Sequence, residues 1–430
     1  MELALIFASF FFLLLLGIPI AFVIGIVSLG YLVIVGGIAL ELLPQRIFMG
    51  IDKYPLMAVP FFILAAELMI EIKILKRLVG LAHALVGHLK GGLAQVNVVG
   101  SVFFAGISGS ALADAGGLGP LEIAMMTEHG YPRAYSAAVT AASAVLGPII
   151  PPSITVVIYA LVAQNVSVTA LLMAGFVPGF IIAIALMVLN YFIAIKKGYP
   201  AAATRASLME LLIAFWNALL PLLMPAILLG GMLLGIFTPT EASAVACGYA
   251  LFLGFFVMRT LKLRTLPVVF IRAALTTGSV FLIMATCNVL TWILASLNLA
   301  PMMETLFKNI SSNPYVFLLL INILFLILGC LLETTAAIII FTPFLAPLAT
   351  SLGIHPIHFG IVVIVNLMIG LITPPVGLVL YVTCNVARIT LEELVREVWP
   401  FILVEIVALA IITYWPTATL FVPRLFGLIQ

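Results

Sequence analysis

The segment Gly-Pro-Ile-Ile-Pro-Pro at residues 147–152 decides the fold, because it places a proline pair inside a stretch that is otherwise apolar enough for a membrane helix. The segment Gly-Leu-Ile-Thr-Pro-Pro at residues 370–375 repeats the pattern 223 positions further on. Proline lacks a backbone N–H and clashes with the preceding turn, so two in a row break a helix and free several carbonyl groups. Lipid cannot satisfy these carbonyls, whereas a cation or a polar substrate can. Paired broken helices in two halves of a membrane protein indicate a transporter binding site.

The composition is that of a membrane protein. Of the 430 residues, 65% are hydrophobic and only 8% are charged, whereas about a quarter of the residues of a soluble domain carry charge. We therefore expect an all-α, polytopic membrane protein. The net charge of +2 gives no reason to expect a nucleic-acid partner. The four cysteines stand singly in apolar sequence, without the spacing of a disulfide framework or of a zinc site.

Sequence motifs for enzymatic chemistry are not found. The chain contains no Gly-x-x-x-x-Gly-Lys-Ser/Thr phosphate loop, so it is not expected to hydrolyse ATP. It also shows no nucleophile and base in a recognisable arrangement. A membrane enzyme is therefore disfavoured, and we expect a transport protein.

Two further apolar regions carry polar interruptions and are predicted to be re-entrant helical hairpins. Residues 93–128 are interrupted by Gly106-Ile107-Ser108-Gly109-Ser110 and by a second glycine-rich stretch at 116–120. Residues 315–350 are interrupted by Glu333-Thr334-Thr335. Ser110 and Glu333 are again 223 positions apart, which predicts an internal duplication.

The duplication divides the chain into a first repeat at 1–200, a cytoplasmic linker at 201–211 and a second repeat at 212–430. In the first repeat we expect scaffold helices within 1–75, a hairpin at 93–128, a broken helix at 134–165 and a helix at 169–195. In the second repeat we expect scaffold helices within 212–298, a hairpin at 315–350, a broken helix at 356–386 and a helix at 400–422.

The positions of the cations predict the orientation. If both termini are periplasmic, only Arg46, Lys53, Lys308 and Arg424 of the 18 lysine and arginine residues lie outside. The other 14 face the cytoplasm, as the positive-inside rule requires. The two repeats then enter the membrane from opposite sides, and the duplication is an inverted repeat.

Hydroxyl groups and freed carbonyls near the interruptions form candidate Na⁺ sites. Ser108 and Ser110 lie at the first hairpin tip, where Gly106 and Gly109 allow a close approach of the backbone to a ligand. Small residues also serve helix packing in membranes, but their recurrence in the second half favours an ion site. The candidate Na⁺ ligands are Ser108, Ser110, Gly147, Pro151, Glu333, Thr334, Thr335, Gly370 and Thr373.

Charged residues at membrane depth are expensive and usually functional. Glu333 and Asp114 lie near the two hairpin turns, and each is a candidate for tuning an ion site; Asp114 could instead cap the helix starting near Ala115. The candidate substrate contacts are Ser108, Gly109, Asp114, Glu333 and Thr334.

The remaining polar residues are assigned more ordinary roles. Glu241 follows Thr238 in a first helical turn, where a carboxylate favours the helix dipole. Glu67 and Glu405 are predicted to face another membrane subunit. The histidines near glycine or proline are predicted to be solvated or interfacial; they are His83, His88, His355 and His358.

Three motifs together resemble a known family. They are the Gly-x-x-x-Pro-Pro repeats, the Ser-Gly-Ser tip followed by Ala-Asp-Ala-Gly-Gly-Leu-Gly at 113–119, and Pro-Thr-Glu-Ala-Ser at 239–243. The combination resembles the large membrane subunit, or M subunit, of TRAP (tripartite ATP-independent periplasmic) transporters, of the ion transporter superfamily. The resemblance covers essentially the whole chain.

The resemblance implies a multi-pass protein of the bacterial inner membrane that imports an organic acid, such as a dicarboxylate or sialic acid, by Na⁺-coupled symport. It implies an elevator mechanism, in which the hairpins and broken helices move against the scaffold. The implied partners are a small membrane subunit (Q type) on a separate polypeptide and a periplasmic substrate-binding protein (P type), expected to dock on the outer segments 42–54 and 300–315. The alternative is a stand-alone Na⁺- or H⁺-coupled carboxylate symporter.

Overall fold

The computed structural model describes residues 2–35, 40–163, 166–199, 205–310 and 313–429. Every regular element in these ranges is a helix. Within the described residues, seven helices are long and apolar enough to cross a membrane, or eight if one bent pair forms a single span. The prediction of an all-α, polytopic membrane protein is therefore confirmed.

The amino-terminal region consists of apolar helices and two short amphipathic ones. Their bounds are α1 (Glu2–Leu15), α2 (Ile20–Val35), α3 (Leu42–Ile51), the short 3₁₀ turn η1 (Tyr54–Met57), α4 (Ala58–Glu71) and α5 (Leu75–Val86). The sequence interpretation missed α3 and α5, because neither is long or apolar enough to register as a span.

The middle of the chain contains three long apolar helices, namely α13 (Leu208–Leu233), α14 (Pro239–Phe252), which continues into the π-helical turn η3 (Leu253–Val257), and α15 (Leu266–Ser296). They are followed by the short helix α16 (Leu299–Ile310), which was also missed. The predicted linker at 201–211 is too long at its carboxyl end, since α13 already begins at Leu208. Ser207 accepts a hydrogen bond from the Glu210 backbone and Glu210 accepts one from the Ser207 backbone, and this capping box starts the helix early.

Both predicted hairpins are present as helix–turn–helix units. The first comprises α6 (Gly92–Ser108), α7 (Ala111–Ala113), the π-helical turn η2 (Asp114–Leu118) and α8 (Gly119–Glu128), and the second comprises α17 (Pro314–Leu331) and α18 (Thr334–Ser351). The first interruption begins at Gly109 rather than at Gly106, which lies within α6. The glycine-rich stretch at 116–120 does not interrupt the helix, which continues through the π turn.

Both proline-pair segments break a helix, as predicted. The first break separates α9 (Arg133–Ala144) from α10 (Ile154–Ala163), and the second separates α19 (Pro356–Gly370) from α20 (Leu378–Ala387). Each proline pair is joined by a cis peptide bond. The last two residues of the predicted segment 134–165 lie outside the described residues.

The helix predicted at 169–195 is present as α11 (Val168–Ala174) and α12 (Phe176–Lys197). The prediction of a single helix at 400–422 is wrong, because two helices cover this region. Helix α21 (Leu391–Tyr414) begins nine residues earlier, at a capping box formed by Thr390 and Glu393, and it is followed by α22 (Pro416–Leu425) at an angle of 64°. Pro416 explains the bend, because proline disfavours a helical conformation of the residue before it.

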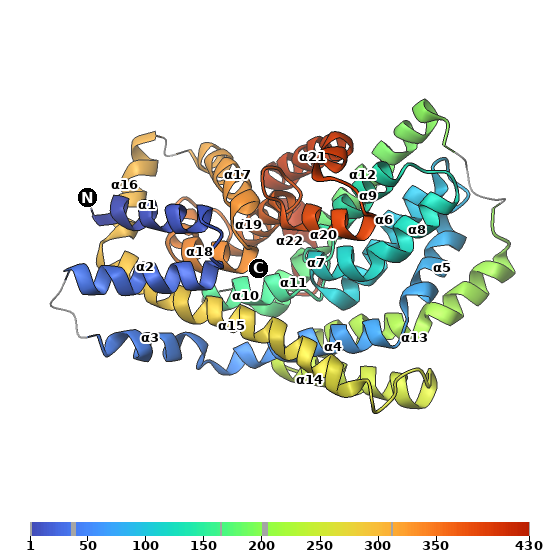
Figure 1. Cartoon of the computed structure of the whole chain (residues 1–430), viewed down its shortest axis with the longest axis horizontal. Coiled ribbons are helices and arrows are strands. Elements are labelled where there is room, and N and C mark those ends of the chain that lie inside the picture. Colours follow the sequence, from blue (N-terminus) through green and yellow to red (C-terminus); the bar gives the residue numbers. More distant parts are fainter. Residues whose placement is uncertain (1, 36–39, 164–165, 200–204, 311–312, 430) are drawn as a thin grey trace.

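The helices form two regions that lie side by side in Figure 1. Helices α3, α4, α13, α14 and α15 lie along the lower edge of the view, and the hairpins and broken helices lie above them. Helix α4 packs along α14, and α2 packs along α15. The N-terminus, α3 and α16 lie at the left end of the view, whereas α5 and the start of α13 lie at the right end.

Candidate functional site

The tip of the first hairpin lies directly against the first proline break. Ser108 ends α6, and Gly109 has a left-handed backbone with φ of 60°. A Cβ atom at Gly109 would lie 2.8 Å from the carbonyl oxygen of Pro152. Only glycine therefore permits this approach, and the predicted role of Gly109 in close backbone contact agrees with the geometry.

Asp114 points from the hairpin toward the break. Its Oδ1 accepts a hydrogen bond from the Ser108 hydroxyl, and its Oδ2 has no hydrogen-bond partner among the described residues. A Cβ atom at Gly147 would lie 2.7 Å from that Oδ2. Asp114 does not cap a helix starting near Ala115, because the helix already begins at Ala111, where Ser110 caps it by accepting from the Ala113 N–H at 3.4 Å. Both Ser108 and Asp114 are 2% exposed, so the hydroxyl, the carboxylate and the break form a buried polar group.

The first break supplies carbonyl oxygens to this group. Among the described residues, no backbone N–H donates to the carbonyl of Gly147 or of Pro151. The Pro151 carbonyl faces α6, where a Cβ atom at Gly106 would lie 3.7 Å away. Hydroxyls, free carbonyls and a carboxylate are the ligands that hard cations prefer.

Glu333 at the second hairpin tip has the same local role as Ser110 at the first. Its side chain caps α18 by accepting from the Ala336 N–H at 3.1 Å. Its other carboxylate oxygen accepts from the Thr335 hydroxyl at 2.9 Å. The matched positions of Ser110 and Glu333 are thus both N-caps, which gives the recurrence in sequence a structural reason.

The second hairpin tip lies against the second break through backbone atoms. A Cβ atom at Gly370 would lie 2.5 Å from backbone atoms of Gly329, and the Gly377 N–H donates to the Cys330 carbonyl at 3.4 Å. Thr373 donates its hydroxyl to the Ile369 carbonyl at 2.8 Å, so its lone pairs stay available to a ligand. Thr334 and Thr335 are buried at the start of α18.

The two hairpins and the two breaks form one connected unit. Helix α10, which follows the first break, packs on α18 of the second hairpin. Helix α20, which follows the second break, packs on α7 and η2 of the first hairpin. The structure therefore brings the first group of candidates together, and it joins that group to the second through these helices.

Hydrogen bonds that the sequence interpretation missed repeat at matched positions. The Tyr135 hydroxyl donates to Asn190 at 2.9 Å, and His358, which lies 223 positions after Tyr135, contacts the carbonyl of Thr413, 223 positions after Asn190, at 3.1 Å. The prediction that His358 is solvated is wrong, because its ring is 1% exposed and its other nitrogen bonds Thr419 at 2.8 Å.

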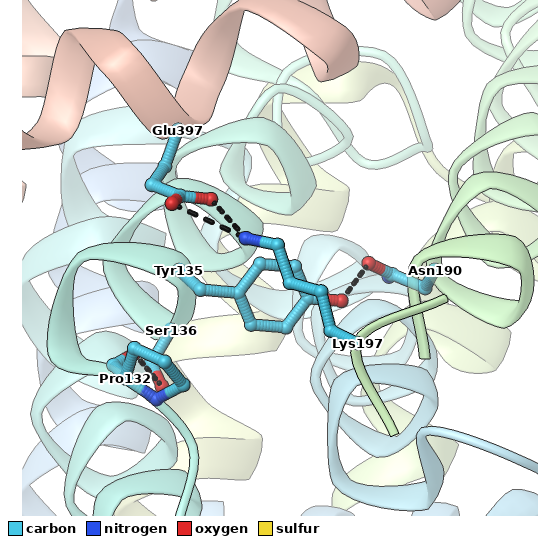
Figure 2. Close-up of polar contacts among 6 residues, drawn as sticks. All are labelled: Pro132, Tyr135, Ser136, Asn190, Lys197 and Glu397. Carbon is cyan, nitrogen blue, oxygen red and sulfur yellow. Dashed lines mark hydrogen bonds and ion pairs between the residues drawn. The ribbon is translucent and has the colours of Figure 1, made fainter. Parts of the chain in front are cut away.

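Figure 2 shows Tyr135 and Asn190 beside the ion pair between Lys197 of α12 and Glu397 of α21. The Lys197 nitrogen lies 2.9 Å from the nearer Glu397 oxygen and 5.6 Å from the centre of the Tyr135 ring. Helix α12 belongs to the first predicted repeat and α21 to the second, so the pair joins the two halves of the chain.

Two carboxylates occupy places that the sequence interpretation did not anticipate. Glu405 is 0% exposed within this chain, so the prediction that it faces another subunit is wrong. Glu122 on α8 was missed and is also 0% exposed. Its position inside the apolar run Leu121-Glu122-Ile123-Ala124-Met125-Met126 was the signal that could have found it.

The predictions for Glu241 and Glu67 fare differently. Glu241 forms a capping box with Thr238 at the start of α14, as expected of a helix-start carboxylate. Glu67 is partly exposed on α4, one turn before Glu71, which lies 3.9 Å from Arg272, and the contact of Glu67 with another subunit stays a prediction.

Comparison with known proteins identifies relatives along the whole chain. The model of the family described as "Tripartite ATP-independent periplasmic transporter, DctM component" matches residues 7–418. The sialic acid TRAP transporter large permease protein SiaM of Vibrio cholerae is 43% identical over 417 residues, covering 96% of this chain and 96% of that protein. The C4-dicarboxylate TRAP transporter large permease protein DctM of Rhodobacter capsulatus is 34% identical and covers 100% of both chains.

A further relative is longer than this chain, and a solved structure shares its fold. The isethionate TRAP transporter permease protein DctMQ of Oleidesulfovibrio alaskensis is 37% identical over 98% of this chain, which spans 66% of that longer protein. Among solved structures, the YdaH transporter of Alcanivorax borkumensis matches with a TM-score of 0.61 at 16% identity over 88% of both chains, a likeness of fold alone.

Proposed function

The chain belongs to the DctM component family of tripartite ATP-independent periplasmic transporters, and from that premise we propose that it is the large permease subunit for Na⁺-coupled import of an organic acid across the bacterial inner membrane. Like these relatives, which are transporter permeases, it is a multi-pass membrane transport protein and not an enzyme. Import, Na⁺ coupling and the inner-membrane location are parts of the proposal.

The observation that carries the Na⁺ proposal is the closing of each hairpin tip on the proline break of its own half. At the first break, the Ser108 hydroxyl bonds the buried Asp114 carboxylate, Gly147 lies against that carboxylate, and the Pro151 carbonyl, which accepts from no described backbone N–H, faces α6. At the second, the backbone of Gly370 touches Gly329, Thr373 follows three residues after Gly370, and Glu333 caps the helix that follows the hairpin tip. Oxygen atoms that are buried without hydrogen-bond partners cost free energy, and a bound hard monovalent cation would remove that cost.

The same geometry supports coupling to an anionic substrate. Asp114 and Glu333 both carry carboxylates beside the tips, and a substrate carboxylate nearby would be repelled by them. A cation bound between the tip and the break removes that repulsion. We therefore propose that Na⁺ binds before the substrate, which contacts the tips at Ser108, Gly109, Asp114, Glu333 and Thr334.

The matched contacts of the two halves support an inverted repeat and an elevator-type movement. The offset of 223 residues relates α2 to α14 and α4 to α15. The contact of α4 with α14 in one half-to-half pairing is therefore repeated by the contact of α15 with α2. The hairpins, breaks and helices α9, α10, α19 and α20 pack as a connected unit beside the helices along the lower edge of Figure 1. Such a unit is suited to move as one body against a fixed scaffold.

The substrate class and the partners follow the relatives. The relatives named for sialic acid, C4-dicarboxylates and isethionate all handle organic acids, and we propose an organic acid here. A small Q-type subunit and a P-type periplasmic binding protein complete the transporter, the latter docking on the end that carries α3 and α16.

Uptake into liposomes tests the proposal. The chain is reconstituted with its small subunit, and uptake of labelled acid is measured with and without the binding protein and an inward Na⁺ gradient. We expect uptake only with both, and a sigmoidal dependence on Na⁺ concentration because two sites are proposed. Equal uptake without the binding protein would favour the stand-alone symporter, and full uptake in Na⁺-free medium would exclude Na⁺ coupling.

A further inference from the structure

Glu122 belongs to neither break and is nevertheless completely enclosed. It lies on α8, the returning arm of the first hairpin, with 0% of its surface exposed. Neither carboxylate oxygen has a hydrogen-bond partner among the described residues. A Cβ atom at Gly100 of α6 would lie 2.9 Å from its Oε1, so the carboxyl group rests against the backbone of the facing helix.

The immediate surroundings of Glu122 are apolar. The position of a Cβ atom at Gly100 also lies 3.9 Å from side-chain carbons of Leu118 and of Val79. Asn97, one turn along α6 from Gly100, directs its amide to Thr140 at 2.7 Å and accepts from Ser143. These neighbouring polar groups are satisfied by one another and not by Glu122.

No cation faces the Glu122 carboxyl group from the described elements packed around it. Helix α6 carries no titratable residue, and η2 carries Asp114, a second buried carboxyl group. The titratable residues on the other neighbouring helices are exposed, engaged elsewhere or neutral: Lys76, Arg77 and His83 on α5, Arg133 and Tyr135 on α9, and Tyr381 and Cys384 on α20.

We propose that Glu122 is a proton-binding site of the first hairpin, and that its carboxyl group is protonated in the conformation described here. An ionised carboxylate without hydrogen bonds in an apolar site is strongly disfavoured, whereas the neutral acid is tolerated. A negative charge on Asp114, which is also buried and lies on the same arm of the hairpin, acts in the same direction, because a like charge disfavours ionisation.

The proton on Glu122 is linked to the cation at the hairpin tip. A positive charge beside Asp114 offsets the repulsion that opposes ionisation of Glu122, so Na⁺ binding favours release of the proton. This linkage rests on the proposed Na⁺ site, whereas the protonation of Glu122 does not. The permease would then exchange a proton for Na⁺ within the first hairpin.

Infrared difference spectroscopy of the purified permease in detergent at pH 7 tests the protonation directly. Subtracting the spectrum of E122Q from that of the parent should leave a positive carboxylic-acid carbonyl band and no carboxylate bands. The matched control is E128Q, which changes an exposed residue of the same helix. Its difference spectrum should contain carboxylate bands and no carboxylic-acid band. Carboxylate bands in the E122Q difference would overturn the proposal. E122M, an apolar replacement of similar length, gives the same comparison if E122Q does not fold.

The linkage is tested by titrating Na⁺ at several pH values and following intrinsic fluorescence. In the parent, the apparent affinity for Na⁺ should fall by up to tenfold for each unit that the pH is lowered, as expected when one proton is displaced. In E122Q the affinity should not change with pH. An equal pH dependence in both proteins would reject the linkage, while an acid band without any Na⁺ binding would leave the proton site and reject the proposed Na⁺ site.

Discussion

At the scale of single residues, the contact of Gly370 with Gly329 shows why the second break needs glycine. The backbones touch, and a Cβ atom at Gly370 would lie 2.5 Å from backbone atoms that cannot rotate away. We expect G370A to lower the stability of the protein by about 1–3 kcal/mol or more, the cost of overpacking a dense interior. Thermal unfolding of the purified protein measures this. The control is G278A, on an exposed part of α15 with nothing within 4 Å, which should be neutral or slightly stabilising.

The Ser108 hydroxyl gives a second prediction at this scale. Its removal in S108A leaves the buried Asp114 carboxylate without its one side-chain donor. We expect Na⁺ affinity to fall by about tenfold, which corresponds to roughly 1.4 kcal/mol for the lost charged hydrogen bond. Smaller losses are expected for S110A, T335A and T373A, and none for T350A, whose hydroxyl only bonds its own helix. Unchanged affinity in all four site variants would mean that backbone carbonyls alone hold the ion.

At the scale of elements, the amino-terminal end of α19 is held by a titratable cap. The ring Nδ1 of His355 accepts a hydrogen bond from the Ile357 N–H at 3.2 Å, which requires the neutral ring. Partial burial and the charge of Arg424 lower the pKa of His355 below its usual 6.5. A lowered folded-state pKa means that the cap is fully present above about pH 6.5 and is lost as the pH falls toward the folded value.

We therefore expect the parent protein to lose about 1 kcal/mol, the typical worth of an N-cap, between pH 7 and pH 5. H355N supplies a cap that does not titrate, and its stability should not show this loss. Melting temperatures of both proteins across the pH range provide the measurement. A parallel decline in the two proteins would assign the pH dependence to other groups.

The elements also show what a sequence can and cannot predict. The proline breaks and hairpins were predictable, because proline and glycine act locally on the backbone. The early start of α21 at Thr390 and its end at Trp415 depend on a capping box and on Pro416, which are local signals too, but hydrophobicity alone hides them. His358 and Glu405 were misplaced, because burial of a polar residue depends on which distant helix packs over it.

The candidate site was predictable to a similar extent. Ser108, Gly109 and Gly147 were chosen from their neighbours in the chain, and the structure brings them together. The bond between Ser108 and Asp114 and the isolation of Glu122 arise from contacts across the hairpin. No spacing in the sequence specifies those contacts.

At the scale of the whole molecule, the orientation can be tested by labelling. Tyr54 at the predicted periplasmic end and Leu263 at the predicted cytoplasmic end are 65% and 75% exposed. In intact spheroplasts, an impermeant thiol reagent should label Y54C and should not label L263C until the cells are opened. The four native cysteines are buried and free, so the background should be low. The reverse pattern would invert the proposed topology and place the α3 and α16 end in the cytoplasm.

The ion pair in Figure 2 is predicted to contribute little to the stability of the contact between the two halves. The side chains of Lys197 and Glu397 are 41% and 34% exposed, and exposed pairs contribute about 0–1 kcal/mol. We expect E397Q to lower the stability by less than about 1 kcal/mol, because helix packing also joins the two halves, along α12 and α21, α4 and α14, and α2 and α15. Chemical denaturation measures the change. A loss of several kcal/mol would show that the pair is shielded from solvent in the assembled transporter.

Helix α15 is taller than the membrane it must cross. Its 31 residues extend about 46 Å at 1.5 Å per residue, against a hydrocarbon thickness of about 30 Å. Even a tilt of about 40°, at the upper end of the usual range, leaves a projection of about 35 Å. The end that carries Arg272, 3.9 Å from Glu71, must then emerge among the lipid headgroups. The helix that packs against α2, α3 and α4 is thus longer than the hydrocarbon layer, and the thickness of the surrounding lipid becomes a variable that acts on this side of the protein.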